Sequence, residues 1–508
     1  MSPVLPIAPQ TAILLAMAIP AAGVVPIALL GRWPNLRETA TLVTAVLLFA
    51  CVLSLVPEVA AGGRPAVTLP GFLPDIPFRF EVEPLGMIFA LVASFLWIVN
   101  SIYSIGYMRG HNEKNQTRFY VCFAVALAST MGVAFAGNML TLFVFYEVLT
   151  LSTYPLVTHK GDRNALHGGR TYLGILLCTS IGLQLLAIVW TWTVAGTLDF
   201  VAGGILAASM AGAGGAAGLM LFLYIYGIGK AALMPIHGWL PAAMVAPTPV
   251  SALLHAVAVV KAGVFSVLKV SVYIFGIDFL AELAASEWIQ AIAAATILIA
   301  ATIALTKDNL KARLAYSTVS QLSYIILGAM LATGWSVVGG GLHLAMHAFG
   351  KITLFFCAGA IMVAAHKTEV SEMKGIGRTM PFTTFAFLIG SFSIIGLPPF
   401  GGMWGKWFLM LGAFDTGQLV MVGVLILGSA LNIMYLLPIP FRGFFSAPDP
   451  GSDPGADGEQ GQPPPEAIKE APLPCLIAIG ITTLGCLALF FFSDPLYRLL
   501  SQIATPTG

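Results

Sequence analysis

Eight ionisable residues stand inside long apolar stretches of this sequence, where charge is ordinarily excluded. They are one glutamate, four lysines and three histidines: Glu147, Lys230, His255, Lys261, His343, His347, Lys351 and Lys406. An ionisable group at mid-bilayer costs several kcal/mol and therefore indicates a function by default. A series of acids and bases at short spacing is what a proton path needs, because each proton hop must be short.

Glu147 and Lys230 are the predicted ion pair of this set. Lys230 lies about a dozen residues from either end of its apolar stretch, roughly 18 Å along a helix, which is too deep for snorkelling to the interface. An unpaired buried charge would neutralise itself, so we predict pairing, with a purely structural bridge as the alternative. Lys406 lies closer to the end of its stretch, and snorkelling stays an alternative there. Lys269 fits snorkelling and is assigned to the interface.

His343, His347 and Lys351 follow each other at i, i+4 and i+8, which predicts one face of a helix. A titratable ladder on one face favours proton transfer along the helix. Two alternatives remain: ligation of haem or metal by the histidines, and hydrogen-bonded contacts between helices. His255 and Lys261 are six residues apart and should each contact a different neighbour.

The composition indicates that the apolar stretches lie in a lipid bilayer and not in water. Of 508 residues only 9% are charged and 58% are hydrophobic, whereas a soluble domain carries about 25% charged residues. This excludes an ordinary soluble enzyme and predicts an all-α membrane protein. A net charge of +1 leaves no basic field for nucleic acid. The six cysteines lie in apolar stretches without a C-x-x-C, which argues against disulfides, a zinc ribbon or an iron–sulfur cluster.

Apolar stretches long enough to span a bilayer, at about 20 residues each, number fourteen. Their predicted limits are 9–30, 38–58, 84–107, 118–137, 138–158, 170–195, 216–240, 249–273, 286–305, 312–331, 336–365, 382–412, 418–441 and 471–497. Alternate loops hold 16 of the Lys and Arg residues and the opposite loops and tails hold 4. This bias predicts both termini outside.

Two irregular segments and two interrupted spans complete the organisation. Residues 59–83 are predicted to be an external loop with a short hairpin, and residues 446–469 a flexible cytoplasmic linker. The seventh and twelfth spans contain Gly and Pro around Lys230 and before Lys406, so both are predicted to be broken helices that line a polar cavity. Two broken spans five apart predict two inverted five-helix repeats. The predicted parts are 1–117, 118–273, 286–441, 446–469 and 470–508.

Three motifs carry a specific resemblance. They are GKAALMPIHGWLPAAMVAPTPVSALLHAVAVVKAG (229–263), KDNLKARLAYSTVSQLSYI (307–325) and HLAMHAFGKITLFF (343–356). Together they resemble the antiporter-like membrane subunits shared by respiratory complex I, Mrp-type cation/proton antiporters and membrane-bound hydrogenases, over roughly residues 80–440.

The resemblance implies a role for each residue that matches a family position. It makes Glu147 and Lys230 the coupled pair, His255 and Lys261 the eighth-span relay, and Lys351 the central lysine. It makes Lys406 the terminal lysine, near which protons leave outward. It adds Lys311, at the start of the tenth span, to the set. Protons would enter from the cytoplasm and cross along Lys230, His255, His343, His347 and Lys351.

The expected function is proton translocation within a multisubunit Na⁺ or K⁺/proton antiporter in a bacterial cell (inner) membrane. The motifs resemble the A-type Mrp subunit and the length suits the D type, so the subunit type stays open. Two alternatives also stay open: a proton-pumping subunit of a complex I-like or hydrogenase-type redox complex, and a proton-conducting partner of an uptake system. No cofactor or metal site is expected in the chain, and it has no catalytic or redox motif. Other membrane subunits and the lipid bilayer are the expected partners.

Overall fold

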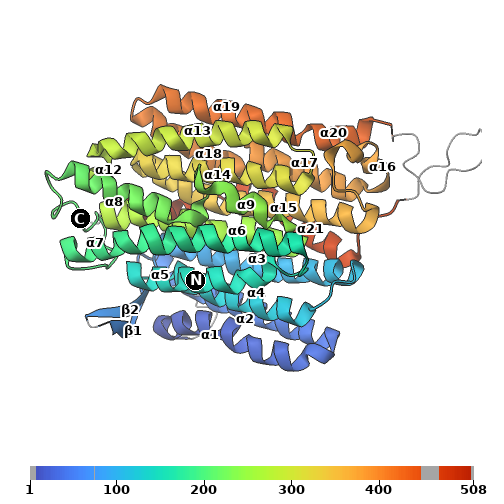
Figure 1. Ribbon diagram of the computed structural model, residues 1–508, viewed down its shortest axis with the longest axis horizontal. Helices are drawn as coiled ribbons and strands as arrows, with labels where there is room; N and C mark the ends of the chain where they lie inside the picture. Colours follow the sequence, from blue (N-terminus) through green and yellow to red (C-terminus); the bar gives the residue numbers. More distant parts are fainter. Residues whose placement is uncertain (1–6, 74, 448–467, 505–508) are drawn as a thin grey trace, which may run out of the picture.

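The computed structural model describes residues 7–73, 75–447 and 468–504. Its helices run side by side along the long axis of the molecule (Figure 1). Within the described residues, twelve helices are long and apolar enough to cross a membrane. Ten predicted spans are single helices: α1 (Pro9–Leu29), α2 (Pro34–Ala60), α3 (Pro84–Gly110), α4 (Gln116–Ala134), α5 (Met139–Val157), α13 (Ala284–Thr306), α14 (Leu310–Leu331), α15 (Gly334–Ala365), α19 (Leu419–Leu436) and α21 (Leu473–Phe491).

Polar caps set where several of these helices begin. The Asn138 side chain accepts from the N–H of Thr141 before α5, and the Asn309 side chain accepts from the N–H of Ala312 before α14. Before α15, Thr333 and Ser336 satisfy each other's main-chain N–H groups. Such caps satisfy N–H groups that have no partner inside the helix, so the chain itself marks these span ends.

Two further spans contain wider, π-helical turns. The sixth consists of α6 (Arg163–Thr179), η2 (Ser180–Gln184) and α7 (Leu185–Ala195), and the eighth of α10 (Thr248–Ala252), η6 (Leu253–Val257), α11 (Val259–Lys269) and η7 (Val270–Phe275). A π-helical turn holds an extra residue and changes which face later residues present. The eighth span is enclosed by other helices along its whole length.

The predicted seventh and twelfth spans are broken, as the Gly and Pro residues indicated. The seventh consists of α8 (Gly214–Gly227), η3 (Gly229–Ala231), η4 (Ile236–Gly238) and α9 (Trp239–Ala242); the twelfth consists of α17 (Pro381–Ile395) and α18 (Gly402–Asp415). Carbonyl groups freed by a break need new partners inside a membrane. The indole N–H of Trp239 donates at 2.9 Å to the carbonyl of Gly229, which also accepts from the main-chain N–H of Ala232.

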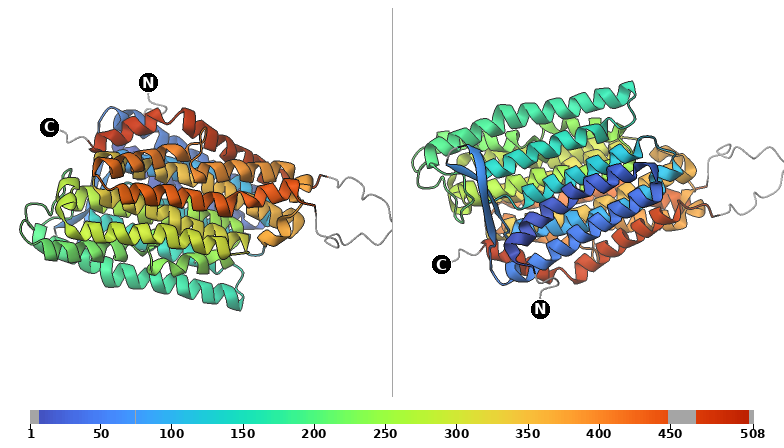
Figure 2. Two further views of the ribbon diagram at one scale, coloured as in Figure 1. Left: turned by 90° about the horizontal axis from the view of Figure 1, so that it is seen from above. Right: turned by 90° about the horizontal axis from the view of Figure 1, so that it is seen from below.

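The hairpin predicted within residues 59–83 is confirmed, and its external position stays a prediction. Strands β1 (Ala66–Leu73) and β2 (Ile76–Glu81) pair antiparallel, with Val67 opposite Phe80. Helix α22 (Asp494–Ala504) lies close to this end, since the Gln502 amide donates to the carbonyl of Ala60. Figure 2 places α22 and the start of α1 toward the hairpin end of the molecule and α16 (Ile376–Thr379) and α20 (Pro438–Phe445) at the opposite end. Most of the predicted linker 446–469 lies outside the described residues.

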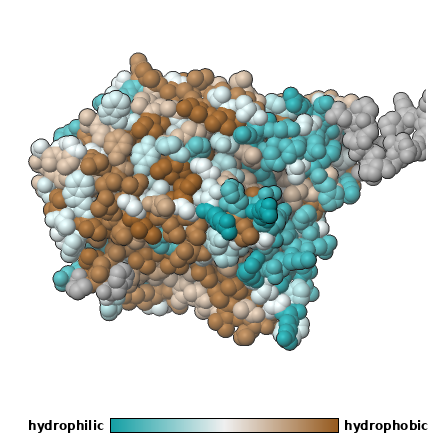
Figure 3. Space-filling view, in the orientation of Figure 1, coloured by the Kyte–Doolittle hydropathy of each residue, from teal (hydrophilic) through white to brown (hydrophobic). Residues whose placement is uncertain are grey.

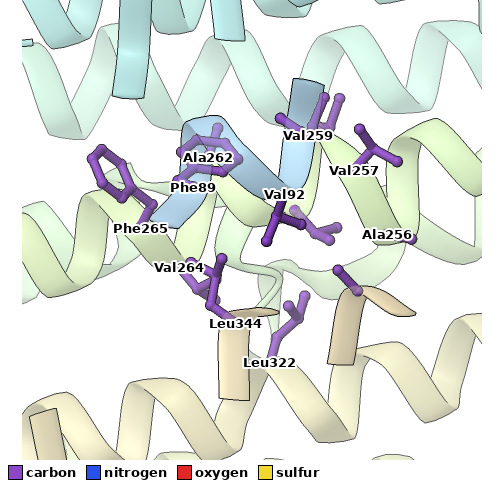
Figure 4. Packing of buried hydrophobic residues seen from close by; sticks show 14 of the residues in the cluster. Phe89, Val92, Ala256, Val257, Val259, Ala262, Val264, Phe265, Leu322 and Leu344 are labelled. Carbon is purple, nitrogen blue, oxygen red and sulfur yellow. The ribbon is translucent and has the colours of Figure 1, made fainter. Parts of the chain in front are cut away.

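Apolar contacts hold the centre of the bundle. Phe89 and Val92 of α3, Val264 and Phe265 of α11, and Leu344 of α15 are buried together (Figure 4). On the outside, apolar residues cover the middle of the molecule, and hydrophilic residues gather at the end that carries α16 and α20 (Figure 3). The chain is therefore a multi-pass membrane protein whose charged loops collect at one end.

Candidate functional site

Seven of the predicted residues are fully or almost fully buried inside the helix bundle. Their side chains come from the seventh, eighth, eleventh and twelfth spans: Lys230, His255, Lys261, His343, His347, Lys351 and Lys406. Glu147 and Lys311 are half-buried. The structure therefore places the predicted lysines and histidines away from lipid, as polar groups within a membrane require.

Lys230 lies in the break of the seventh span and is held by α5. Its Nζ donates to the carbonyl of Tyr146 at 2.7 Å and to Oγ1 of Thr150 at 2.6 Å. The ammonium also lies 3.0 Å from the centroid of the Tyr146 ring, and the Lys230 main-chain N–H donates to the Tyr146 hydroxyl. Gly263 of α11 packs directly on the Lys230 backbone, where a Cβ would come within 2.4 Å.

The predicted ion pair of Glu147 and Lys230 is not formed. Both carboxylate oxygens of Glu147 are buried and have no hydrogen-bond partner among the described residues. The reason lies in helix geometry: successive residues point about 100° apart around a helix axis, and Lys230 contacts α5 on the side of Tyr146. Glu147 is the next residue along α5, so its side chain leaves the helix in a different direction from that of Tyr146.

Lys351 is held by α14 in the same manner as Lys230 is held by α5. Its Nζ donates to the carbonyl of Leu314 at 3.2 Å and to Oγ of Ser317 at 2.5 Å. The hydroxyl of Tyr435 lies 2.7 Å from Ser317 Oγ and 2.5 Å from Oδ1 of Asn432. The Ser317 hydroxyl therefore belongs to a buried polar chain that continues into α19.

Lys406 lies one turn into α18, after the break of the twelfth span. Its Nζ donates to the freed carbonyl of Ile395 at 2.9 Å and to Oγ of Ser429 at 3.0 Å. These inward bonds exclude snorkelling. A cavity of about 310 Å³ adjoins Lys406, and its lining includes the exposed residues Trp407 and Ile426, so it opens on the side of the bundle.

A continuous series of contacts joins Lys261 to Lys406. Nζ of Lys261 lies 2.5 Å from Nδ1 of His347, whose ring centroid lies 5.8 Å from that of His343. The His343 ring stacks on Tyr324 at 5.7 Å, and Nζ of Lys406 lies 4.9 Å from the Tyr324 ring centroid on the other side. The predicted ladder on α15 thus extends through a tyrosine to the lysine of the broken twelfth span.

His255 and Lys261 contact different residues, but both residues belong to α15. The His255 ring lies 4.7 Å from that of Phe355, and its two nitrogens have no hydrogen-bond partner in the described structure. The π-helical turn that contains His255 alters the helical phase. This explains why positions six apart face one neighbouring helix. Lys311, at the start of α14, donates to the carbonyl of Ala246 at 2.5 Å.

The surroundings of Lys230, Lys351 and Lys406 share one chemical pattern, called here the neutral cradle: one main-chain carbonyl and one hydroxyl. In the described part of the chain, no carboxylate hydrogen-bonds any of the three. A carbonyl accepts from an ammonium or from a neutral amine, and a hydroxyl can accept from the first or donate to the second. A neutral cradle can therefore satisfy a lysine in both protonation states, as a site that gains and loses protons must.

The interpretation of Lys269 as a snorkelling residue is wrong. Its side chain is buried, and its Nζ lies 3.3 Å from Oε1 of Glu83 and 4.3 Å from the Phe200 ring centroid. Glu83, at the start of α3, also accepts from two main-chain N–H groups and from the Tyr273 hydroxyl. The sequence placed Glu83 in a loop, and 186 residues separate it from Lys269, so no local pattern pointed to this pair.

Sequence reasoning also missed Tyr146, Thr150, Ser317 and Tyr324, which form the cradles and the link to Lys406. Their positions in the sequence could have pointed to three of them: Ser317 and Tyr324 lie within the motif 307–325, and Tyr146 precedes Glu147. Among the described residues, no group of three or more His, Cys, Asp or Glu is placed to hold a metal ion.

Comparison with known proteins gives two matching family models. The model for "NADH:quinone oxidoreductase/Mrp antiporter, TM" matches residues 136–432. The model for "NADH-Ubiquinone oxidoreductase (complex I), chain 5 N-terminus" matches residues 73–120. The first match covers more than half of the chain and includes every residue of the neutral cradles.

Several relatives are about equally similar in sequence. NADH-quinone oxidoreductase subunit N of Desulforudis audaxviator is 30% identical over 445 residues, 86% of each chain. Hydrogenase-4 component B of Escherichia coli is 30% identical over 380 residues, 70% of this chain and 55% of that protein. NAD(P)H-quinone oxidoreductase chain 5 of Synechocystis is 30% identical over 361 residues, 67% of this chain. The chain spans about half the length of the last two, 55% and 51%.

Two solved structures share the fold along nearly the whole chain. A chain of the Mrp complex from Dietzia sp. superimposes with a TM-score of 0.82 at 22% identity, over 96% of both chains. A chain of an archaeal respiratory complex, the membrane-bound sulfane sulfur reductase, gives 0.82 at 21% identity, over 97% of both. At this identity the likeness establishes the fold, and both neighbours are subunits of multisubunit membrane complexes.

Proposed function

Because this chain belongs to the NADH:quinone oxidoreductase/Mrp antiporter transmembrane family, we propose that it carries protons across a membrane as one subunit of a multisubunit complex. It is an antiporter-like subunit related to those of complex I, Mrp antiporters and hydrogenases. The residues proposed to carry the proton, called here the buried relay, are Glu147, Lys230, His255, Lys261, Lys311, His343, His347, Lys351 and Lys406.

One observation carries this proposal: the series of direct contacts from Lys261 through His347, His343 and Tyr324 to Lys406. Each member except Tyr324 is an amine or imidazole that binds a proton reversibly, and the Tyr324 ring contacts both His343 and Lys406. Short steps between buried bases favour movement of protons over movement of a larger ion. The neutral cradles support the proposal because they satisfy the lysines with or without the extra proton.

Glu147 is proposed to control the charge of Lys230 without a fixed bond to it. Its carboxylate oxygens are buried and have no hydrogen-bond partner among the described residues, and Glu147 is the residue next to Tyr146 of the Lys230 cradle. Movement of this carboxylate toward Lys230 would favour the ammonium form, and movement away would favour release of a proton into the relay. The titrations of the two groups are then coupled, so an apparent pKa belongs to the pair.

Two energy sources are proposed, each favoured by a specific observation. The fold of the Mrp complex chain from Dietzia favours exchange of Na⁺ or K⁺ for protons. The relatives named as NADH-quinone oxidoreductase subunits favour a proton pump driven by electron transfer in partner subunits. In either case the hairpin end is proposed to face outward. The end with α16 and α20 is proposed to face the cytoplasm of a bacterial cell, because the Lys and Arg residues of the loops concentrate at that end.

Everted vesicles from an antiporter-deficient host test this function. The chain is expressed with the membrane subunits encoded beside its gene, and a pH-sensitive dye reports proton movement after addition of NaCl, KCl or NADH. A salt response identifies cation exchange, and a response to NADH alone identifies the redox-driven pump. Lys230→Ala should abolish either response, while Lys469→Ala, at an exposed lysine, should not. Normal transport by Lys230→Ala would overturn the proposed function.

A further inference from the structure

Three titratable residues at the end of the bundle opposite the hairpin lie outside the buried relay. Glu113 follows α3, and its carboxylate lies between two imidazoles. Oε1 is 4.0 Å from Nε2 of His111, and Oε2 is 3.9 Å from Nε2 of His159, which follows α5. The exposed fraction of these side chains falls from 36% at His111 to 9% at Glu113 and 1% at His159. The group therefore leads from water into the protein.

The inner members of this group have unused hydrogen-bonding capacity. Oε1 of Glu113 and both ring nitrogens of His159 are buried and have no hydrogen-bond partner within the described residues. Buried polar atoms without partners are uncommon and need an explanation. A purely structural carboxylate would be expected to use such atoms, as Glu83 does with its four donors.

Burial favours the neutral form of His159, and the charges around it act in both directions. Burial lowers the pKa of His159, and Glu113 opposes this shift. Arg118, which donates to the His159 carbonyl, and Lys160 also lower the pKa, while the main chain of Lys114 raises it. An imidazole held in this way takes a proton from the carboxylic acid and gives it up again readily.

The group is linked to the buried relay through Lys311. Lys311 donates to the carbonyl of Ala246, in the segment between α9 and α10. The same region includes Thr248, two residues after the carbonyl that accepts from Lys311. Its hydroxyl lies 3.5 Å from that of Tyr107, whose ring lies 6.0 Å from the His111 ring.

We propose that His111, Glu113 and His159 form a proton-collecting site that loads the buried relay through Lys311. The proposal rests on the proposed function. A proton from water binds His111 and passes to the Glu113 carboxylate. The O–H bond of the resulting carboxylic acid then breaks as an N–H bond forms on His159 or on the neutral amine of Lys311. Each step moves one proton, and no oxidant, metal or cofactor takes part.

The test uses the assembled complex in the vesicles described above. Without the Glu113 carboxylate, the buried imidazole of His159 loses an opposite charge 3.9 Å away that raises its pKa, so it holds a proton less often. Glu113→Gln should therefore slow the initial rate of proton uptake about tenfold near neutral pH and shift its pH optimum downward. Added imidazole buffer, a mobile proton carrier, should restore the rate, and Glu113→Asp should retain part of it.

His111→Gln should give a smaller loss, and His167→Gln is its matched control, because His167 is an exposed histidine at the same end of the bundle. A Glu113→Gln complex that assembles and transports at the normal rate overturns the collecting site. So does a slow Glu113→Gln complex that imidazole fails to rescue, because that result indicates a structural role. The proposed function is judged separately, since Lys230→Ala must remain inactive in the same vesicles with or without imidazole.

Discussion

Four buried lysines divide into two groups when their partners are compared. Lys230, Lys351 and Lys406 each donate to a carbonyl and a hydroxyl, whereas Lys269 faces the Glu83 carboxylate near the hairpin. All four are at most 4% exposed, so burial does not separate them. A carboxylate that accepts four hydrogen bonds fixes the ammonium form of Lys269, and a neutral cradle leaves both protonation states open. The chemistry of the partner therefore distinguishes a structural lysine from one suited to carry protons.

Breaking the Glu83–Lys269 pair should have the largest effect on stability. Glu83→Gln leaves an ammonium buried without its counter-charge, which costs about 3–5 kcal/mol. We expect a large drop in melting temperature of the purified complex and less protein in the membrane, with transport per molecule retained. The double variant Glu83→Gln with Lys269→Met should recover part of the stability. Loss of transport at normal stability would place this pair in the proton path instead.

Removing a lysine from a neutral cradle should have the opposite effect: transport falls and stability is retained. Lys351→Met keeps the length of the side chain but removes its proton site, so transport should fall about a hundredfold or more, the range of acid–base catalysis. The melting temperature should change little, because no counter-charge is left unpaired. Dye quenching in vesicles gives the rate, and Lys367→Met, in the loop after α15, is the control. A destabilised Lys351→Met protein with normal transport per molecule would contradict the distinction, because Lys351 would then be a structural lysine like Lys269.

Changing the hydroxyl of a cradle should have an intermediate effect. Ser317→Ala and Thr150→Val remove the group that can donate to a neutral lysine, worth about 1 kcal/mol, and should slow transport about fivefold. Thr130→Val is the matched control, since its buried hydroxyl bonds a carbonyl of its own helix, α4. Unchanged transport in both cradle variants would show that the neutral lysine needs no donor.

Replacing an exposed carboxylate should have the smallest effect on stability. Its comparison with Glu83→Gln shows how much burial adds to the contribution of a carboxylate. Asp308 accepts from Oγ of Ser371 at 2.6 Å and from its N–H at 2.9 Å. These bonds lower the Asp308 pKa, so the stability they add is present above the ordinary pKa of 3.8 and is lost as the pH falls through the lowered value. Asp308→Asn should reduce the melting temperature at pH 7 by about one degree, because exposed interactions contribute little. A drop as large as that of Glu83→Gln would contradict this view of burial.

Much of the architecture could be predicted from the sequence. The apolar stretches marked the spans, and Gly227, Gly229 and Pro235 marked the first break while Pro398 and Gly401 marked the second, because helix formation in a membrane depends on local composition. The i, i+4, i+8 spacing placed His343, His347 and Lys351 on one buried face. The inverted relation of the two repeats and the residue limits of the parts remain predictions.

The sequence by itself determined that the lysines and histidines deep in the apolar stretches had to be buried, because charges there cannot reach water, but it did not identify Lys269 and Glu83 as buried. Only the tertiary structure decided what each one contacts. Lys230 meets Tyr146 and Thr150 instead of Glu147, and Lys269 meets Glu83 across 186 residues. Helix periodicity fixes the direction of a side chain relative to its own helix. Its partner depends on how separate helices pack against one another, and no local pattern in the sequence encodes that arrangement.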